Sequence, residues 1–253
     1  MTTLKQLWKT VRDHTVFGLT FWKQSVTNSG IRLSLKAASP RVRFALLTGY
    51  EVEDVRLCQK FLGPKDRVLE LGSAVGFIAL FCLKNIGIKD YAMVEANPHL
   101  FPVVRENFAL NKMAVPQLLH LAAGPVDADV TFNVSRDYFA STLLEHDPST
   151  QPVAVQQRTI PSILAQLSFM PNVLIMDIEG GETQIPIEHL CLFDKIIVEF
   201  HARFVGEAAI DRIISALLTN GYALAATDNW SNVFIRNPVQ STTAPSHRQV
   251  AHA

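Results

Sequence analysis

Residues 67–83, RVLELGSAVGFIALFCL, decide the fold of this chain. A run of mostly aliphatic residues leads into a turn containing Gly72 and Gly76, and an apolar helical pattern follows. Glycines allow a tight strand-to-helix turn and let a ligand approach the backbone closely. The stretch therefore predicts a ligand-binding strand, turn and helix, although glycines needed only for packing would give the same pattern.

Similar short β-branched runs alternate with helical patterns from residue 67 to residue 236, which is typical of a parallel sheet with crossover helices. The last two runs are separated by a turn at Asp228 and Asn229 that is too short for a parallel crossover, so we expect them to be antiparallel. The prediction is an α/β fold with helices on both faces of a mostly parallel sheet. The expected strands are 67–71, 91–95, 118–122, 173–177, 195–201, 222–226 and 233–236.

The regions on either side of this pattern differ from it. Residues 1–66 predict a mainly helical cap that begins with an amphipathic helix, which we expect to pack on its own domain rather than on a membrane or partner. Residues 129–160 predict an extra hairpin where loops would line the crevice of the sheet. Residues 237–253 lose their large apolar side chains and predict a disordered tail.

Composition excludes several classes of function. The 253 residues carry 23 Lys plus Arg and 23 Asp plus Glu, so no basic excess is available to bind a nucleic acid. The longest stretch without a formal charge, 159–176, is interrupted by prolines, so we expect no membrane span. Three cysteines without a CxxC pair predict neither a disulfide framework nor a zinc ribbon, and favour a reducing, cytoplasmic location. The oligomeric state is left open.

Two carboxylates accompany the glycine turn. Glu70 precedes Gly72 by two residues, and its negative charge would repel a pyrophosphate. An acid at this position suits a cationic or zwitterionic cofactor such as S-adenosylmethionine. Alternatively, Glu70 could pair with a Lys or Arg at the end of the sheet. Glu95 follows Gly72 by 23 residues, where a Rossmann-type fold places an acid that accepts both ribose hydroxyls. Asn97 is the expected N-cap of the next helix, with Pro98 at its first position.

A second group of polar residues follows two later strands. In NVLIMDIEGGETQI, 172–185, Asp177 and Glu179 share one side of the strand end. In KIIVEFHARF, 195–204, Glu199 and His201 do the same. Because the carboxyl ends of adjacent parallel strands meet at one crevice, we expect these side chains to converge.

Three carboxylates, Asp177, Glu179 and Glu182, are close enough in sequence to raise a pKa or to need a cation. A divalent metal on them is an alternative because oxygen ligands suit Mg²⁺, but we expect no metal. Glu182 could also begin a helix, and His201 could be structural.

The motifs VLELGSAVGFIAL, VEANPHLFPVVRENFALN, MDIEGGE and IIVEFH resemble those of the FkbM family of S-adenosylmethionine-dependent methyltransferases, over about residues 50–236. The resemblance implies a Rossmann-like class I methyltransferase fold with seven strands, of which the last is antiparallel. Ala74 departs from the family, which often has Asn there. Many methyltransferases have an acid or amide after the third strand, whereas this chain offers only Ala122, Ala123 and Gly124 before Asp127. We therefore expect a backbone or apolar contact with adenine there.

The expected activity is methyl transfer from S-adenosylmethionine to a hydroxyl of a small molecule, sugar or natural product. The alternatives are N-methylation of a peptide amide side chain and a non-catalytic S-adenosylmethionine-binding module; a nicotinamide-dependent oxidoreductase is disfavoured by the missing GxGxxG pattern. The expected cofactor residues are Glu70, Gly72, Ser73, Gly76, Glu95, Asn97 and Ala122. The expected catalytic residues are Asp177, Glu179 and His201, with Glu182 and Glu199 toward the substrate.

Overall fold

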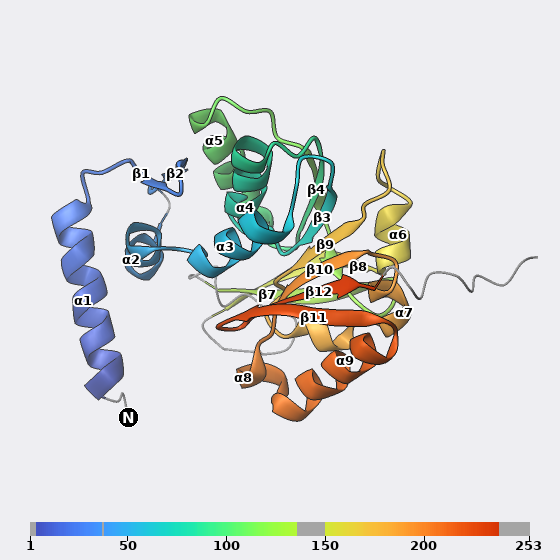
Figure 1. The fold of residues 1–253 in the computed structure, drawn as a ribbon. Helices are drawn as coiled ribbons and strands as arrows, with labels where there is room; N and C mark the ends of the chain where they lie inside the picture. Colours follow the sequence, from blue (N-terminus) through green and yellow to red (C-terminus); the bar gives the residue numbers. More distant parts are fainter. Residues whose placement is uncertain (1–3, 37, 136–149, 238–253) are drawn as a thin grey trace, which may run out of the picture.

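The structure, a computed structural model, describes residues 4–36, 38–135 and 150–237, and is centred on a seven-stranded sheet (Figure 1). The strand order is β11-β12-β10-β9-β3-β4-β5. Only β12 runs against its neighbours, so the mostly parallel sheet with a final antiparallel hairpin is confirmed. The strands are β3 (Arg67–Leu71), β4 (Asp90–Glu95), β5 (Gln117–His120), β9 (Val173–Met176), β10 (Lys195–Glu199), β11 (Tyr222–Asp228) and β12 (Ser231–Arg236).

Helices cover both faces of this sheet, which explains why its central strands are apolar on both sides. In β3, Val68 packs toward one helical layer while Leu69 and Leu71 pack toward the other. The first layer holds α3 (Val52–Phe61), α4 (Phe77–Phe81), the π-helix η1 (Cys82–Ile86) and α5 (Phe101–Leu110). The second holds α6 (Ile160–Leu164), α7 (Ile187–Leu190) and α9 (Glu207–Thr219). Shorter turns are η2 (Pro98–Leu100), η4 (Gly181–Gln184) and α8 (Ala202–Val205).

The N-terminal region contains helices and also a β-hairpin that the sequence analysis did not predict. Its elements are α1 (Leu4–Thr20), β1 (Ser25–Asn28), β2 (Ile31–Ser34) and α2 (Pro40–Thr48). The hairpin turns at Ser29 and Gly30, which both have positive φ, as a two-residue turn requires. It is held on α5, because the side chain of Asn107 accepts the Ser34 N–H at 2.8 Å.

The first helix, α1, packs against α2. The guanidinium of Arg12 lies 3.7 Å from the ring centre of Phe44, and buried Arg43 donates to the carbonyl of Thr20 at the end of α1. Within the three described ranges of the chain, none of the helices has the length and apolar character needed to cross a membrane.

A separate three-stranded sheet, in the order β6-β8-β7, follows β5. Its strands are β6 (Ala122–Ala123), β7 (Ala128–Val134) and β8 (Gln151–Arg158), and the antiparallel pairing of β7 with β8 is the extra hairpin that was expected. The predicted strand 118–122 was wrong in one respect, because the chain leaves the main sheet after His120 and Ala122 pairs with β8. The loop residues 136–149 and the tail from 238 onward lie outside the described residues.

Candidate active site

A cavity of about 300 Å³ lies at the carboxyl ends of the central strands. Successive strands run from β3 outward to β5 on one side, and from β9 outward through β10 on the other. Ligands of open α/β sheets bind at such a reversal of strand order. The cavity has two ends that differ in chemistry: one formed by the glycine turn and Glu95, the other by the acids around His201.

Gly72 lies where the two ends meet. Its φ is +86°, and a Cβ atom at this position would lie 1.7 Å from the carbonyl oxygen of Asp177. Gly76 also has positive φ and precedes α4, where a Cβ would lie 3.1 Å from the ring of Phe108. Gly72 is therefore needed for the close approach of the turn to the end of β9, and it also lines the cavity.

Glu95 forms the centre of the first end. Its Oε2 accepts the N–H of Ala74 at 2.8 Å and its Oε1 accepts the N–H of Asn97 at 2.7 Å. Burial raises the pKa of Glu95 to about 7, against the lowering effect of these backbone donors. Asn97 in turn accepts the N–H of His99 at 3.0 Å, which confirms it as an N-cap. Each oxygen of Glu95 has accepted one N–H and keeps acceptor capacity for a ligand.

Glu70 does not line the cavity, contrary to the expectation for this residue. It is 4% exposed, and the hydroxyl of Tyr91 donates to its Oε2 at 3.0 Å. Burial raises its pKa to about 8. The physical reason is strand alternation: Glu70 shares the side of Val68 and points into the helical layer. Since β3 is buried on both faces, its sequence gives no sign of which face meets the ligand.

Some of the other expected cofactor residues line the cavity and some do not. Gly72, Glu95, Asn97 and Ala122 line the cavity, whereas Ser73 and Gly76 do not. Ser73 is 3% exposed, so it lies beneath the turn rather than on its open side.

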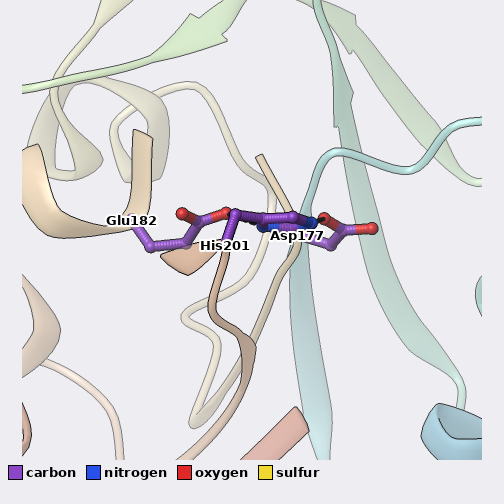
Figure 2. A group of neighbouring side chains, drawn as sticks. All are labelled: Asp177, Glu182 and His201. Atoms are coloured by element: carbon purple, nitrogen blue, oxygen red, sulfur yellow. Dashed lines mark hydrogen bonds and ion pairs between the residues drawn. The ribbon is translucent and has the colours of Figure 1, made fainter. Parts of the chain in front are cut away.

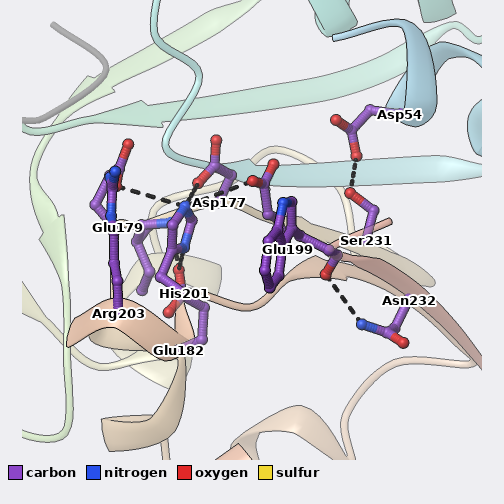
Figure 3. Close-up of polar contacts among 11 residues, drawn as sticks. Asp54, Asp177, Glu179, Glu182, Glu199, His201, Arg203, Ser231 and Asn232 are labelled. Atoms are coloured by element: carbon purple, nitrogen blue, oxygen red, sulfur yellow. Dashed lines mark hydrogen bonds and ion pairs between the residues drawn. The ribbon is translucent and has the colours of Figure 1, made fainter. Parts of the chain in front are cut away.

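The second end of the cavity is built around His201, with carboxylates on both ring nitrogens (Figure 3). His201 Nε2 lies 3.6 Å from Asp177 Oδ1, 3.4 Å from Glu179 Oε2 and 3.6 Å from Glu199 Oε1. His201 Nδ1 lies 3.1 Å from Glu182 Oε1 (Figure 2). The structure thus brings together the polar residues that follow β9 and β10, as their positions at two adjacent parallel strand ends indicate.

Glu182 does not face the cavity, so the sequence-based expectation that it binds substrate is not supported. It is fully buried, and its Oε1 accepts the Ile178 N–H at 3.0 Å while contacting His201. The chain turns back at Glu179 and Gly180, which both have positive φ, and this turn carries Glu182 under the end of β9. Glu182 orients the imidazole instead.

Charge is concentrated at this end. Burial, followed by the neighbouring Glu199 and Glu179, holds the pKa of Asp177 well above its usual range. Burial and the nearby carboxylates raise the pKa of Glu199 to about 7. Burial alone would lower the pKa of His201, but the hydrogen bond and charge of Glu182 raise it. Arg203 lies on α8 and donates to Glu179 Oε2 at 2.7 Å.

Residues that the sequence analysis missed close the cavity from two sides. Glu51 and Asp54 come from the start of α3, and Trp230 and Ser231 from the β11–β12 hairpin. The Ser231 hydroxyl donates to Asp54 at 2.7 Å and joins these segments. These two residues are 177 positions apart in the sequence, so no local pattern indicated that the two segments meet. The segment after β4 and the extra hairpin add Leu100 and Phe132.

No protein-family model matches the sequence, and no curated protein matches it. Among solved structures, M. jannaschii TYW2 in complex with AdoMet is similar with a TM-score of 0.47, 14% identity and coverage of 84% of this chain and 86% of that one. Precorrin-6y C5,15-methyltransferase from Geobacter metallireducens is similar with a TM-score of 0.47 and 14% identity, over 75% of this chain and 88% of that one. Methyltransferase FkbM from Methylobacillus flagellatus is similar with a TM-score of 0.44 and 14% identity, over 69% of this chain and 44% of that one.

Proposed function

We propose that this protein is an S-adenosylmethionine-dependent methyltransferase of the FkbM type that acts on a hydroxyl group. The observation that carries the proposal is the division of the cavity, in which Glu95 faces the glycine turn at one end and a histidine with carboxylates stands at the other. Such an arrangement supplies a place for a nucleoside and, beside it, groups that can orient and deprotonate an acceptor.

The residues at the first end fit the cofactor. Glu95 keeps acceptor capacity for both ribose hydroxyls, and Gly72 presents backbone without a side chain. Ala122 lines the cavity where adenine would lie, which matches an apolar or backbone contact. Asn97 holds the following turn in place.

The bound cofactor would supply a methyl group on a sulfonium, and the acceptor oxygen would form its bond to that methyl as the carbon–sulfur bond breaks with its electron pair going to sulfur. The chain must therefore align the acceptor, exclude water and remove one proton. We assign proton removal to His201 or the Asp177 and Glu179 pair, and acceptor orientation to Glu199. All four residues line the cavity.

The proposed acceptor is a hydroxyl of a small molecule, sugar or natural product. An amide nitrogen of a peptide side chain is the alternative for the same site, because an amide would also need a proton acceptor. Trp230 is 55% exposed at the β11–β12 hairpin turn and offers an apolar surface for a ring at the mouth of the cavity.

The proposal is tested by calorimetric titration of the purified protein with S-adenosylhomocysteine, with NAD as the control ligand. We expect micromolar or tighter binding of S-adenosylhomocysteine alone. Binding of NAD in its place would indicate a nicotinamide-dependent enzyme, and binding of neither would contradict the proposal. Tight binding without methyl transfer into any fraction of a metabolite extract would indicate a non-catalytic module.

A further inference from the structure

We propose that α1 docks this protein on the surface of an anionic lipid membrane. The contact surface is the α1 stripe, which consists of Trp8, Val11, Thr15 and Leu19, together with Trp22 just beyond the end of the helix. The proposal goes beyond the methyltransferase activity and does not depend on it. Sequence reasoning led us to expect that α1 packs on its own domain, and the helix does contact α2 with a different face.

The two faces of α1 have different surroundings. The face toward α2 buries Asp13 and places the ring centre of Phe17 5.3 Å from the Arg43 guanidinium. Residues 8, 11, 15 and 19 follow one another at helical spacing on the opposite side, and all four are exposed. Trp8 is 73% exposed and Leu19 is 70% exposed. Figure 1 shows α1 at the edge of the molecule, away from the seven-stranded sheet, where its outer face can meet a flat surface.

Two polar groups of the α1 stripe are already bonded within the chain. The hydroxyl of Thr15 donates to the carbonyl of Val11 at 2.8 Å. The indole N–H of Trp22 donates to the carbonyl of Leu19 at 3.1 Å, which holds this ring at the end of the helix although it is 63% exposed. Because these donors are satisfied, moving them into an apolar medium breaks no hydrogen bond to water.

Exposed apolar side chains are concentrated at α1. Of the eleven large apolar side chains that are exposed among the described residues, five lie between residues 8 and 22: Trp8, Val11, Leu19, Phe21 and Trp22. The other six are spread from residue 126 to residue 230. Single exposed apolar side chains are ordinary, whereas a group of them marks a surface that meets a partner or a membrane.

The charge of the same region is strongly positive. The first 50 residues hold eight Lys and Arg and one acid, a net charge of +7, whereas the remaining 203 hold 15 and 22, a net charge of −7. The one acid, Asp13, is buried. Lys9 directly follows Trp8 and is exposed. Lys23 directly follows Trp22, and its Nζ lies 5.5 Å from the centre of the indole ring. This separation of charge directs the N-terminal region toward a negatively charged surface.

An anionic bilayer fits both the apolar and the basic side chains. A second copy docked face to face would bring two regions of net charge +7 together. A nucleic acid would attract the lysines but would leave Val11 and Leu19 without apolar neighbours. At a bilayer, the apolar side of a helix enters the boundary between headgroups and acyl chains, while lysines reach the lipid phosphates. Trp8 and Trp22 stand at the two ends of the stripe, and tryptophan is enriched at this boundary.

The test is co-sedimentation of the full chain with vesicles of phosphatidylcholine, prepared with and without about one third phosphatidylserine. We expect the protein to bind vesicles that contain phosphatidylserine about tenfold or more tightly than vesicles that lack it. This binding should weaken as the NaCl concentration is raised to about 1 M. Equal binding to the two kinds of vesicle, or binding to neither, would overturn the proposal.

Paired substitutions test the apolar part of the α1 stripe. Trp8→Ser combined with Leu19→Ser should weaken vesicle binding about 100-fold, since each large apolar side chain that leaves water contributes about tenfold or more. Met170→Ser combined with Leu192→Ser is the matched control, because both residues are exposed and lie outside α1. Unchanged circular dichroism would show that both proteins are folded. Equal effects of the two pairs would contradict the assignment to α1.

A second pair tests the charge. Lys9→Glu combined with Lys23→Glu should remove the preference for phosphatidylserine, whereas Lys65→Glu combined with Lys89→Glu, at exposed positions outside the N-terminal region, should retain it. Retention of the preference in both variants would overturn the electrostatic part of the proposal.

Tryptophan fluorescence locates the contact directly. In Trp230→Phe, the two remaining tryptophans are Trp8 and Trp22. Vesicles with phosphatidylserine should shift their emission to shorter wavelength, and brominated lipids should quench it. Emission that does not change on binding would show that another surface meets the lipid. A lipid-free dimer that Trp8→Ser with Leu19→Ser dissociates would assign the face to a second copy, and binding of RNA without binding of vesicles would assign it to a nucleic acid; either result would overturn the proposal.

Discussion

The two ends of the cavity hold their carboxylates in different ways: the carboxylate of the first end is buried, and those of the second end are partly exposed. At the first end, Glu95 is 6% exposed and each of its oxygens accepts a backbone N–H. At the second, Asp177 Oδ1 has no hydrogen-bond donor, and Glu179 and Glu199 stand around the same imidazole nitrogen. Backbone N–H groups stabilise the carboxylate of Glu95, whereas the carboxylates of the second end contact His201 and, in the case of Glu179, Arg203.

This difference fits ligand binding at the first end and proton transfer at the second. A carboxylate fixed by backbone donors is a rigid acceptor suited to hydroxyl groups of a ligand. A group of carboxylates around one histidine is costly for the fold, and groups with pKa values perturbed in this way concentrate at functional sites.

Substitutions at the second end should reduce turnover while leaving cofactor affinity largely unchanged. For Asp177→Asn and for His201→Ala we expect a loss of about 10²–10⁴ in methyl transfer, the usual contribution of a group that moves a proton. The measurement is transfer of labelled methyl from S-adenosylmethionine into a metabolite extract, together with calorimetry of S-adenosylhomocysteine. Glu188→Gln, at an exposed position of α7, is the control. Equal losses of turnover and of affinity would place Asp177 or His201 in the cofactor site.

Gly72→Ala should damage both ends together. A Cβ at this position would lie 1.7 Å from the Asp177 carbonyl oxygen, and the positive φ disfavours any side chain. We expect a loss of about 3 kcal/mol in the free energy of unfolding. Denaturant unfolding measures it, with Gly63→Ala as a matched control because no atom lies within 4 Å of a Cβ there. Wild-type stability in Gly72→Ala would show that β9 can shift away freely.

Glu95 should make cofactor affinity depend on pH. The carboxyl must be ionised to accept ribose hydroxyls, and its pKa is about 7 because of burial. Affinity for S-adenosylhomocysteine should therefore fall by up to about tenfold per pH unit below pH 7. Glu95→Gln should bind about 10- to 100-fold more weakly at pH 8, since a charged hydrogen bond is lost.

Calorimetry between pH 5.5 and 8.5 tests both statements about Glu95. Asp90→Asn, at the exposed opposite end of β4, should behave as the wild type. A wild-type affinity that does not change with pH would remove Glu95 from the ribose site.

The smallest effect on cofactor binding and turnover is expected for Glu70, which belongs to neither end. Its pKa is about 8 in the fold against an ordinary 4.5, so the folded state holds a proton that the unfolded state releases. This stabilising contribution is complete below pH 4.5 and is lost by up to about 1.4 kcal/mol per pH unit as pH rises toward 8. Glu70→Gln should unfold with a correspondingly flatter dependence on pH, measured by urea unfolding at pH 6, 7 and 8. If the free energy of unfolding depended on pH equally in the wild type and in Glu70→Gln, the prediction that folding raises the pKa of Glu70 would be wrong.

Local patterns were sufficient for the sheet. The strand at 67–71, the strand at 173–177 to within one residue and the final hairpin follow from β-branched runs, glycine turns and loop length, all of which act between near neighbours in the chain. The hairpin at Ser29 and Gly30 was missed because its strands, SVTN and IRLS, contain no apolar run like VLIM of β9.

The sequence alone determined that Glu95 follows a glycine turn and that Asp177, Glu179, Glu199 and His201 end neighbouring strands, because topology brings such ends to one crevice. Only the tertiary structure decided which of these side chains face the cavity. Glu70 and Glu182 look equally eligible in the sequence, yet both are buried, one by strand alternation and the other by a turn with two positive φ angles. Charge pairing and burial depend on contacts between distant segments, and these exist only once the chain has folded.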